Sequence, residues 1–141
     1  MSNIPINVTN KNTIQIQLWR LKDNHFRILQ DGEFSLLLSG PGYILIKQEL
    51  LSVFKKLGNE QLRITQRKII DQVLKIEFND YYELTIKNSI SPEIIDSIKI
   101  QGQQVWIYME EHLFVSPELK EILASQFNNE LGFSEGFSHF G

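Results

Sequence analysis

Two stretches of this chain, YILIKQELLSVF at residues 43–54 and HLFVSPELKEIL at residues 112–123, follow one pattern without a gap. The offset is constant at 69 positions (112 minus 43), so the order and spacing of the residues agree as well as their composition. In each stretch a short apolar run precedes apolar residues three and four positions apart, which is typical of a strand leading into an amphipathic helix. The likeness extends over residues 36–64 and 105–133 and predicts an internal repeat of two similar β-α-β units.

The repeat predicts two principal helices, at residues 48–57 and 117–126. The second helix has the clearer start, because Ser116 suits the N-cap and Pro117 suits the first turn. A polar turn and a short apolar strand follow each helix, LRIT in the first unit and LGFS in the second. The alternative is a chance match between two amphipathic helices, since only four aligned positions carry identical residues.

Alternating apolar and polar residues predict a strand at residues 13–20, TIQIQLWR, with its isoleucines and leucine on one face. Asp31-Gly32 lies between two apolar runs and predicts a hairpin turn, because both residues tolerate positive φ. A second hairpin is predicted at Gln101-Gly102, between IDSIKI and QVWIYM.

The segment VLKIEFNDYYELTI alternates again and predicts two strands around a turn at Asn79-Asp80. SPEIIDSI predicts one or two helical turns that begin after Ser91. Together these elements predict an α+β fold with a mainly antiparallel sheet. Because 141 residues is close to the usual size of one domain, residues 1–141 are expected to form a single domain.

The composition excludes several classes of site and segment. Cysteine is absent, which removes disulfides, thiolate nucleophiles and cysteine-rich zinc sites. The opening MSNIPINVTN lacks the features of a signal peptide, and no apolar run approaches the roughly 20 residues of a spanning helix. We therefore expect a cytoplasmic protein with no membrane partner. Residues 134–141 carry Phe137 and Phe140, which either pack over the core or leave a mobile tail.

Charge divides the chain into two halves of opposite sign. Residues 1–70 hold ten Lys and Arg against five Asp and Glu, giving +5, and residues 71–141 hold four against twelve, giving −8; the sum is the net charge of −3. One interpretation is simply a difference between solvated faces. The other is an acidic surface that attracts a basic partner protein, and it argues against nucleic acid as the ligand of the second half.

No group of residues predicts catalysis, metal binding or a cofactor. The three histidines, His25, His112 and His139, are far apart, and the carboxylates of Glu110 and Glu111 adjoin only His112. Adjacent strand residues point to opposite faces, so this triplet is expected to be a solvated edge and not a metal site. Glycine-rich phosphate loops and nucleophile elbows are also missing. The chain is therefore not expected to be an enzyme.

The aromatic residues of the second half have two possible roles. Trp106 and Tyr108 share one face of a strand whose other face is also apolar, so burial in a central strand is the simpler explanation. The alternative is an exposed partner-binding patch, because aromatic residues beside charges often centre protein interfaces. The candidate partner-binding residues are Asp80, Tyr81, Glu83, Trp106, Tyr108, Glu110 and Glu111.

Two motifs resemble those of bacterial immunity proteins that neutralise the toxin domains of polymorphic toxin systems. The first is the strand Tyr81, Tyr82, Leu84 and Ile86, and the second is FVS-x-x-L-x-x-x-L from Phe114 to Leu123. The first unit carries a related helix entry, in which Lys47 replaces the serine. The resemblance covers residues 36–133 and consists mainly of hydrophobic positions.

The resemblance implies a small protein that binds one cognate toxin, blocks its active site and has no chemistry of its own. A basic toxin fits the acidic second half of the chain. The alternative is a regulatory or adaptor module that binds another cellular protein. The sequence gives no indication of the oligomeric state.

Overall fold

The computed structural model describes residues 3–11 and 14–140, apart from the side chain of His139. Thr13, where the first predicted strand begins, lies outside the described residues. The elements are, in chain order, β1 (Ile6–Asn10), β2 (Gln17–Arg20), β3 (Phe26–Gln30), β4 (Leu37–Gly40), β5 (Tyr43–Lys47), η1 (Gln48–Leu50), α1 (Leu51–Phe54), β6 (Leu62–Asp71), β7 (Ile76–Ile86), η2 (Ile95–Ser97), β8 (Val105–Tyr108), β9 (His112–Val115), α2 (Pro117–Phe127), β10 (Leu131–Glu135) and η3 (Ser138–Phe140).

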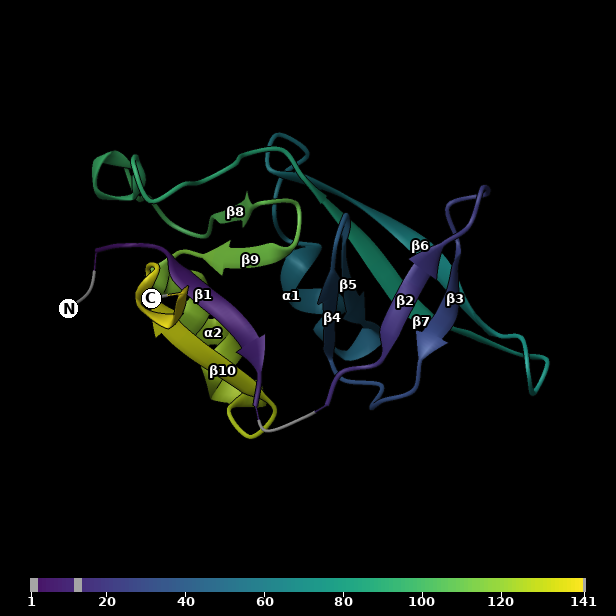
Figure 1. The fold of residues 1–141 in the computed structure, drawn as a ribbon. Coiled ribbons are helices and arrows are strands. Elements are labelled where there is room, and N and C mark those ends of the chain that lie inside the picture. Colours follow the sequence, from purple (N-terminus) through teal and green to yellow (C-terminus); the bar gives the residue numbers. More distant parts are fainter. Residues whose placement is uncertain (1–2, 12–13, 141) are drawn as a thin grey trace.

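The strands form two sheets (Figure 1). One has four strands in the order β10-β1-β9-β8, and the other has six in the order β2-β3-β6-β7-β5-β4. Every pairing between neighbouring strands is antiparallel except the short parallel pairing of β3 with β6. The predicted α+β class with mainly antiparallel sheet is therefore confirmed.

A central core fills the space where the two sheets and both helices meet. Because side chains alternate between the two faces of a strand, each sheet turns every second side chain toward this core. Examples are Ile6 and Val8 on β1, and Ile44 and Ile46 on β5. The helices contribute residues at helical spacing, of which Leu50 and Leu119 are 2% and 0% exposed. The two leucines that the repeat aligns are thus both core residues.

Each sheet also buries part of its opposite face. On the six-stranded sheet, Phe26, Leu45 and Tyr81 belong to a second cluster. On the four-stranded sheet, a third cluster contains Trp106 and Phe114 and is covered by the end of the chain. The ring of Phe137 lies 4.8 Å from that of Tyr108 and 5.0 Å from that of Phe114. Of the two roles considered for residues 134–141, packing over the core is therefore the one observed for Phe137.

The second predicted helix is confirmed as α2, whereas the first is shorter than expected. Ser116 caps α2 by accepting a hydrogen bond from the backbone N–H of Leu119 at 3.4 Å, and Pro117 begins its first turn. The helix predicted at residues 48–57 is reduced to η1 and the four residues of α1. Lys47 occupies the N-cap there, and its side chain makes no capping hydrogen bond.

The predicted hairpin at Asp31-Gly32 is wrong, because β3 pairs with β2 and β6, not with β4. The observed hairpin joins β2 to β3, with Asn24 at a φ of 69°. Gly32 is required for a different reason, since a Cβ there would lie 2.5 Å from the backbone nitrogen of Ile16. Ile14, expected on the buried face of its strand, is 77% exposed.

The predicted turn at Asn79-Asp80 is also wrong, because β7 is one continuous strand through both residues. β6 pairs Arg67 with Tyr81 and Ile69 with Phe78, so β7 carries one extra residue and Asn79-Asp80 form a β-bulge. The turn between β6 and β7 lies earlier, where the Asp71 carboxylate accepts hydrogen bonds from two following backbone N–H groups at 3.0 Å each.

Gln101-Gly102 does not form the predicted hairpin either, because β8 pairs with β9 and the preceding IDS segment is the 3-10 helix η2. The helical turns predicted to begin after Ser91 are reduced to this one 3-10 turn, whose N-cap is Ile94 and not Ser91, and no side chain caps it. The β8–β9 hairpin turns instead at Met109 and Glu110, whose φ values are 52° and 58°. Positive φ is costly for residues other than glycine, so propensity alone did not indicate this turn.

Side-chain amides close two sheet edges and join the sheets. The amide of Asn10, on β1, pairs with both the N–H and the C=O of Leu37, on edge strand β4. The amide of Gln15 likewise accepts from the N–H of Ser39 at 3.0 Å and donates to the C=O of Ser39 at 2.6 Å. At the edge of β8, Gln61 accepts from the N–H of Val105 at 3.0 Å and donates to the C=O of Gln103 at 2.7 Å.

We predict that Gln61→Ala lowers the free energy of unfolding by about 1 to 3 kcal/mol, because it leaves polar groups beside the buried Val105 without partners. Urea denaturation monitored by circular dichroism measures the change. Gln72→Ala, at the exposed β6–β7 turn, is the matched control and is expected to change stability by less than about 0.5 kcal/mol. Equal stability of both variants would contradict a structural role for the Gln61 amide.

Candidate functional site

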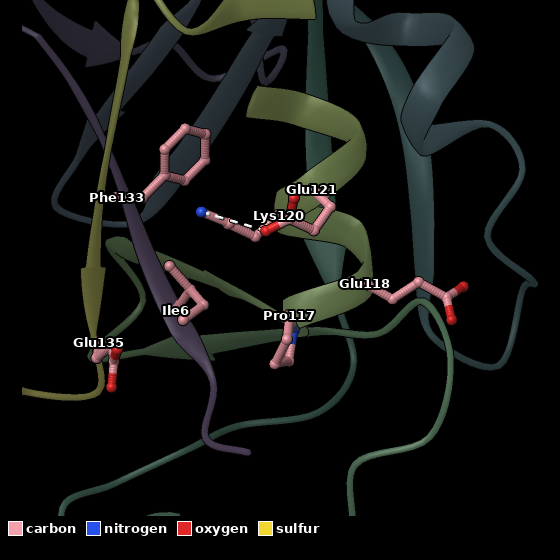
Figure 2. Close-up of a pocket in the computed structure, with 7 residues that line it drawn as sticks. All are labelled: Ile6, Pro117, Glu118, Lys120, Glu121, Phe133 and Glu135. Atoms are coloured by element: carbon pink, nitrogen blue, oxygen red, sulfur yellow. Dashed lines mark hydrogen bonds and ion pairs between the residues drawn. The ribbon is translucent and has the colours of Figure 1, made fainter. Parts of the chain in front are cut away.

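A groove of about 480 Å³ lies between α2 and edge strand β10 (Figure 2). It is lined by Ile6, Pro117, Glu118, Lys120, Glu121, Phe133 and Glu135. The side chain of Ile6 is buried in the central core, so the floor of the groove is continuous with that core. We call it the acidic groove.

Local sequence rules produce this groove. The Ser116 cap and Pro117 fix where α2 starts, and Leu119 and Leu123 hold its inner face on the core. This leaves Glu118 and Glu121 on the exposed side of the helix. After a polar turn the chain returns as β10, which brings Phe133 and Glu135 beside the first turns of α2.

The groove contains three carboxylates and one ammonium group, a formal charge of −2 from Glu118, Glu121 and Glu135 against Lys120. The Nζ of Lys120 lies 3.4 Å from an Oε1 atom of Glu121 and 5.7 Å from the centre of the Phe133 ring. Figure 2 shows Lys120 between that ring and Glu121, while Glu118 points away. This combination of apolar floor and acidic rim suits a long cationic side chain, which buries its stem and keeps its charge paired.

The structure divides the predicted partner-binding residues between the two sheets. Asp80, Tyr81 and Glu83 lie on β7 of the six-stranded sheet, and the other four lie on or beside the β8–β9 hairpin of the four-stranded sheet. They do not form one aromatic patch.

Burial removes three of these residues from the surface. Tyr81 is 0% exposed and its hydroxyl donates to the C=O of Ser35 at 2.7 Å. Trp106 is 5% exposed in the third cluster, as the simpler explanation of its sequence had it. Glu83 is 7% exposed. The alternative of an exposed patch is therefore wrong for Tyr81 and Trp106, because both face apolar clusters.

Glu83 lies at the centre of an ion-pair network. Its carboxylate is 2.6 Å from Nη2 of Arg20 and 2.7 Å from Nε of Arg67, and Arg20 also donates to the C=O of Gly42 at 2.8 Å. Burial alone would raise the pKa of the Glu83 carboxyl, but hydrogen bonds and charge from Arg20 and Arg67 outweigh it and hold that pKa below its ordinary value. Both arginines belong to the basic first half, so part of the charge division of the sequence is neutralised inside the molecule.

The remaining predicted residues reach solvent to different degrees. Glu110 is exposed at the β8–β9 turn, while Glu111 and Asp80 are half-buried. Tyr108 is half-buried under the rings of Phe137 and Phe140. Glu110 is the most exposed of the predicted residues, and we call Glu110 with its neighbour Glu111 the acidic tip.

A second hollow, which sequence reasoning missed, lies between the two edge strands β2 and β4. The six-stranded sheet curls until side chains join these edges. The amide of Gln15, just before β2, pairs with Ser39 of β4, and the N–H of Leu18 on β2 donates to Tyr43 Oη, from β5, at 3.3 Å. We call this hollow the seam cavity; its volume is about 630 Å³. It is lined by Trp19 and Leu29, which are 56% and 51% exposed, and also by Glu111. The sequence did contain a signal for the exposure of Trp19. It shares the polar face of its strand with Gln15 and Gln17, which alternate with the buried Ile16 and Leu18.

Among the described residues, no three His, Cys, Asp or Glu side chains are placed to hold a metal ion. Within the same residues, no helix has the length and apolar character needed to cross a membrane. No protein-family model matches the chain, and no curated protein or solved structure shows significant similarity to it.

We predict that Glu83→Gln lowers the free energy of unfolding at neutral pH by about 3 kcal/mol, because it leaves Arg20 and Arg67 without their carboxylate. This is the lower end of the range for a buried pair, since the side chain of Arg20 is 32% exposed. Because the folded pKa of Glu83 is depressed, its contribution is present above the unfolded pKa and is lost as the pH falls through the folded value.

The difference between wild type and Glu83→Gln is therefore expected to shrink as the pH is lowered from about 7 to about 3. Urea denaturation at several pH values measures it. Glu77→Gln is the control. Glu77 is half exposed and its carboxylate lies 3.6 Å from Nζ of the exposed Lys68, and an ion pair at such a surface position contributes little to stability. A pH-independent difference would show that hydrogen bonding, and not charge, is what Glu83 supplies.

Proposed function

We propose that this protein is an immunity protein that binds and blocks a cognate basic toxin. The acidic groove is the observation that carries the proposal, since it offers carboxylates around an apolar floor on the half of the chain with a charge of −8. A toxin that acts on nucleic acid needs a basic surface, and carboxylates compete for that surface most directly. The sequence resemblance to polymorphic-toxin immunity proteins supports the same function.

We also propose that the two similar segments are an internal repeat. In the first, hairpin β4–β5 is followed by a helix and by β6, and β7 lies between β5 and β6. In the second, hairpin β8–β9 is followed by a helix and by β10, and β1 lies between β9 and β10. The shared strand order supports duplication of one unit. The strand between the last two strands of the unit comes from the chain after the segment in the first copy (β7) and from the chain before it in the second (β1).

A second candidate function is a regulatory or adaptor module without a toxin partner. The seam cavity favours the adaptor function, because Trp19 and Leu29 offer an apolar contact surface. The acidic groove, in contrast, offers charge. The two functions differ in partner chemistry, so they are separable by experiment.

We expect the protein to rescue bacteria from the toxin encoded beside it. Co-expression with that toxin, followed by colony counts and by isolation of the complex, tests the proposal. Rescue that disappears in a Glu118→Lys/Glu121→Lys variant would support binding at the acidic groove. A stable complex without rescue would favour the adaptor, and loss of rescue only with Trp19→Ala would move the interface to the seam cavity.

The acidic tip gives a separate prediction about association kinetics. Glu110→Lys/Glu111→Lys is expected to slow association with the toxin while changing fold stability little, because exposed charges steer encounter but contribute little to stability. Stopped-flow mixing at increasing salt measures the effect, which should weaken as the Debye length falls below about 8 to 10 Å. An on-rate that does not depend on salt or on the reversal would contradict electrostatic steering at the tip.

A further inference from the structure

The hydrogen bonds at both ends of β10 fix which of its backbone groups face β1. The N–H of Lys11 donates to the C=O of Glu130 and the N–H of Gly136 donates to the C=O of Pro5, each at 2.8 Å. Bonded pairs alternate along an antiparallel ladder, so Gly132 and Ser134 also face β1. The backbone groups of Leu131, Phe133 and Glu135 therefore face the opposite way, toward the outer edge of the sheet.

This outer edge differs from the edges of β4 and β8. Among the described residues, the outward N–H and C=O of Phe133 have no hydrogen-bond partner, and neither has the N–H of Glu135. Ser138 Oγ donates to the C=O of Glu135 at 2.8 Å and covers only that end. At β4 the outward groups are held by side-chain amides, and at β8 the N–H of Ile90 donates to the C=O of Ile107 at 2.9 Å. In Figure 1, β10 lies on the outside of the molecule.

The open edge and the acidic groove are side by side. Phe133 and Glu135 belong to β10 and also line the groove, so their side chains lie on the α2 face of the sheet. In an added antiparallel strand, the residues that bond to these two would have side chains on the same face. Alternate side chains of such a strand would therefore enter the groove, where the formal charge is −2.

We propose that the edge of β10 binds an extended, cationic segment of a partner protein as a fifth, antiparallel strand, with Lys or Arg at alternate positions in the acidic groove. Backbone hydrogen bonds to Phe133 and Glu135 supply affinity, and the groove selects positive side chains. The identification of this partner with a toxin rests on the proposed function, whereas the mode of binding does not.

The test uses three peptides with the unmodified protein. The probe is acetyl-Lys-Val-Lys-Val-Lys-Val-amide, and two analogues carry N-methyl groups either on all Lys or on all Val backbone nitrogens. In the proposed register the Lys N–H groups bond to β10 and the Val N–H groups face solvent. Methylation at Lys should therefore weaken binding at least about tenfold, while methylation at Val should have little effect.

Nuclear magnetic resonance titration measures affinity and location together. Binding should shift the amide signals of Phe133 and Glu135 and slow hydrogen exchange at Phe133. Equal affinity for the three peptides, or unchanged exchange at Phe133, would overturn strand addition. Glu121→Lys should abolish binding, and Glu93→Lys, an equal charge change at an exposed site outside the groove, should not.

The outcomes also separate this inference from the proposed function. Binding of the probe by a protein that fails to rescue cells from the toxin would leave strand addition in place and remove the immunity function. Rescue by a protein that does not bind the probe would overturn strand addition and leave the immunity function standing.

Discussion

Backbone hydrogen bonding at the sheet edges is the constraint on which the arrangement of this protein depends. Two of the amides that close an edge come from outside the sheet they protect: Asn10 of the four-stranded sheet pairs with Leu37, and Gln61, next to the six-stranded sheet, pairs with Val105. Unpaired edge groups would otherwise invite pairing with another chain. The contacts that join Asn10 to Leu37 and Gln61 to Val105 thus also hold the two sheets around one core, whereas the outer backbone groups of Phe133 on β10 remain open.

Local patterns predicted the helices better than the turns. Ser116 and Pro117 act within a few residues, so the start of α2 was readable from sequence. Asp31-Gly32 and Asn79-Asp80 have turn chemistry, yet strand pairing over long distances placed one pair in a connection and the other in a bulge. Strand β1 was missed although Ile6 and Val8 alternate with polar residues, because the segment is short and rich in asparagine.

The site was harder to predict than the fold, because residue type does not determine exposure. Tyr81 and Trp106 have the composition of an interface, but both lie on strands packed against apolar clusters. Glu83 counted as an acidic surface residue until the fold brought Arg20 and Arg67 beside it. The acidic groove combines residues that lie 129 positions apart, from Ile6 to Glu135, and no sequence window contains it.

The position of β1 between β9 and β10 has a consequence for synthesis on the ribosome. β1 is made before β2 to β7, but both of its partners are made only after residue 111. Strands β2 to β7 can pair as soon as residue 86 has left the exit tunnel, while Ile6 and Val8 wait with their apolar faces uncovered. The four-stranded sheet therefore closes last, and this long-range step is the one in which a nascent chain most needs protection from aggregation.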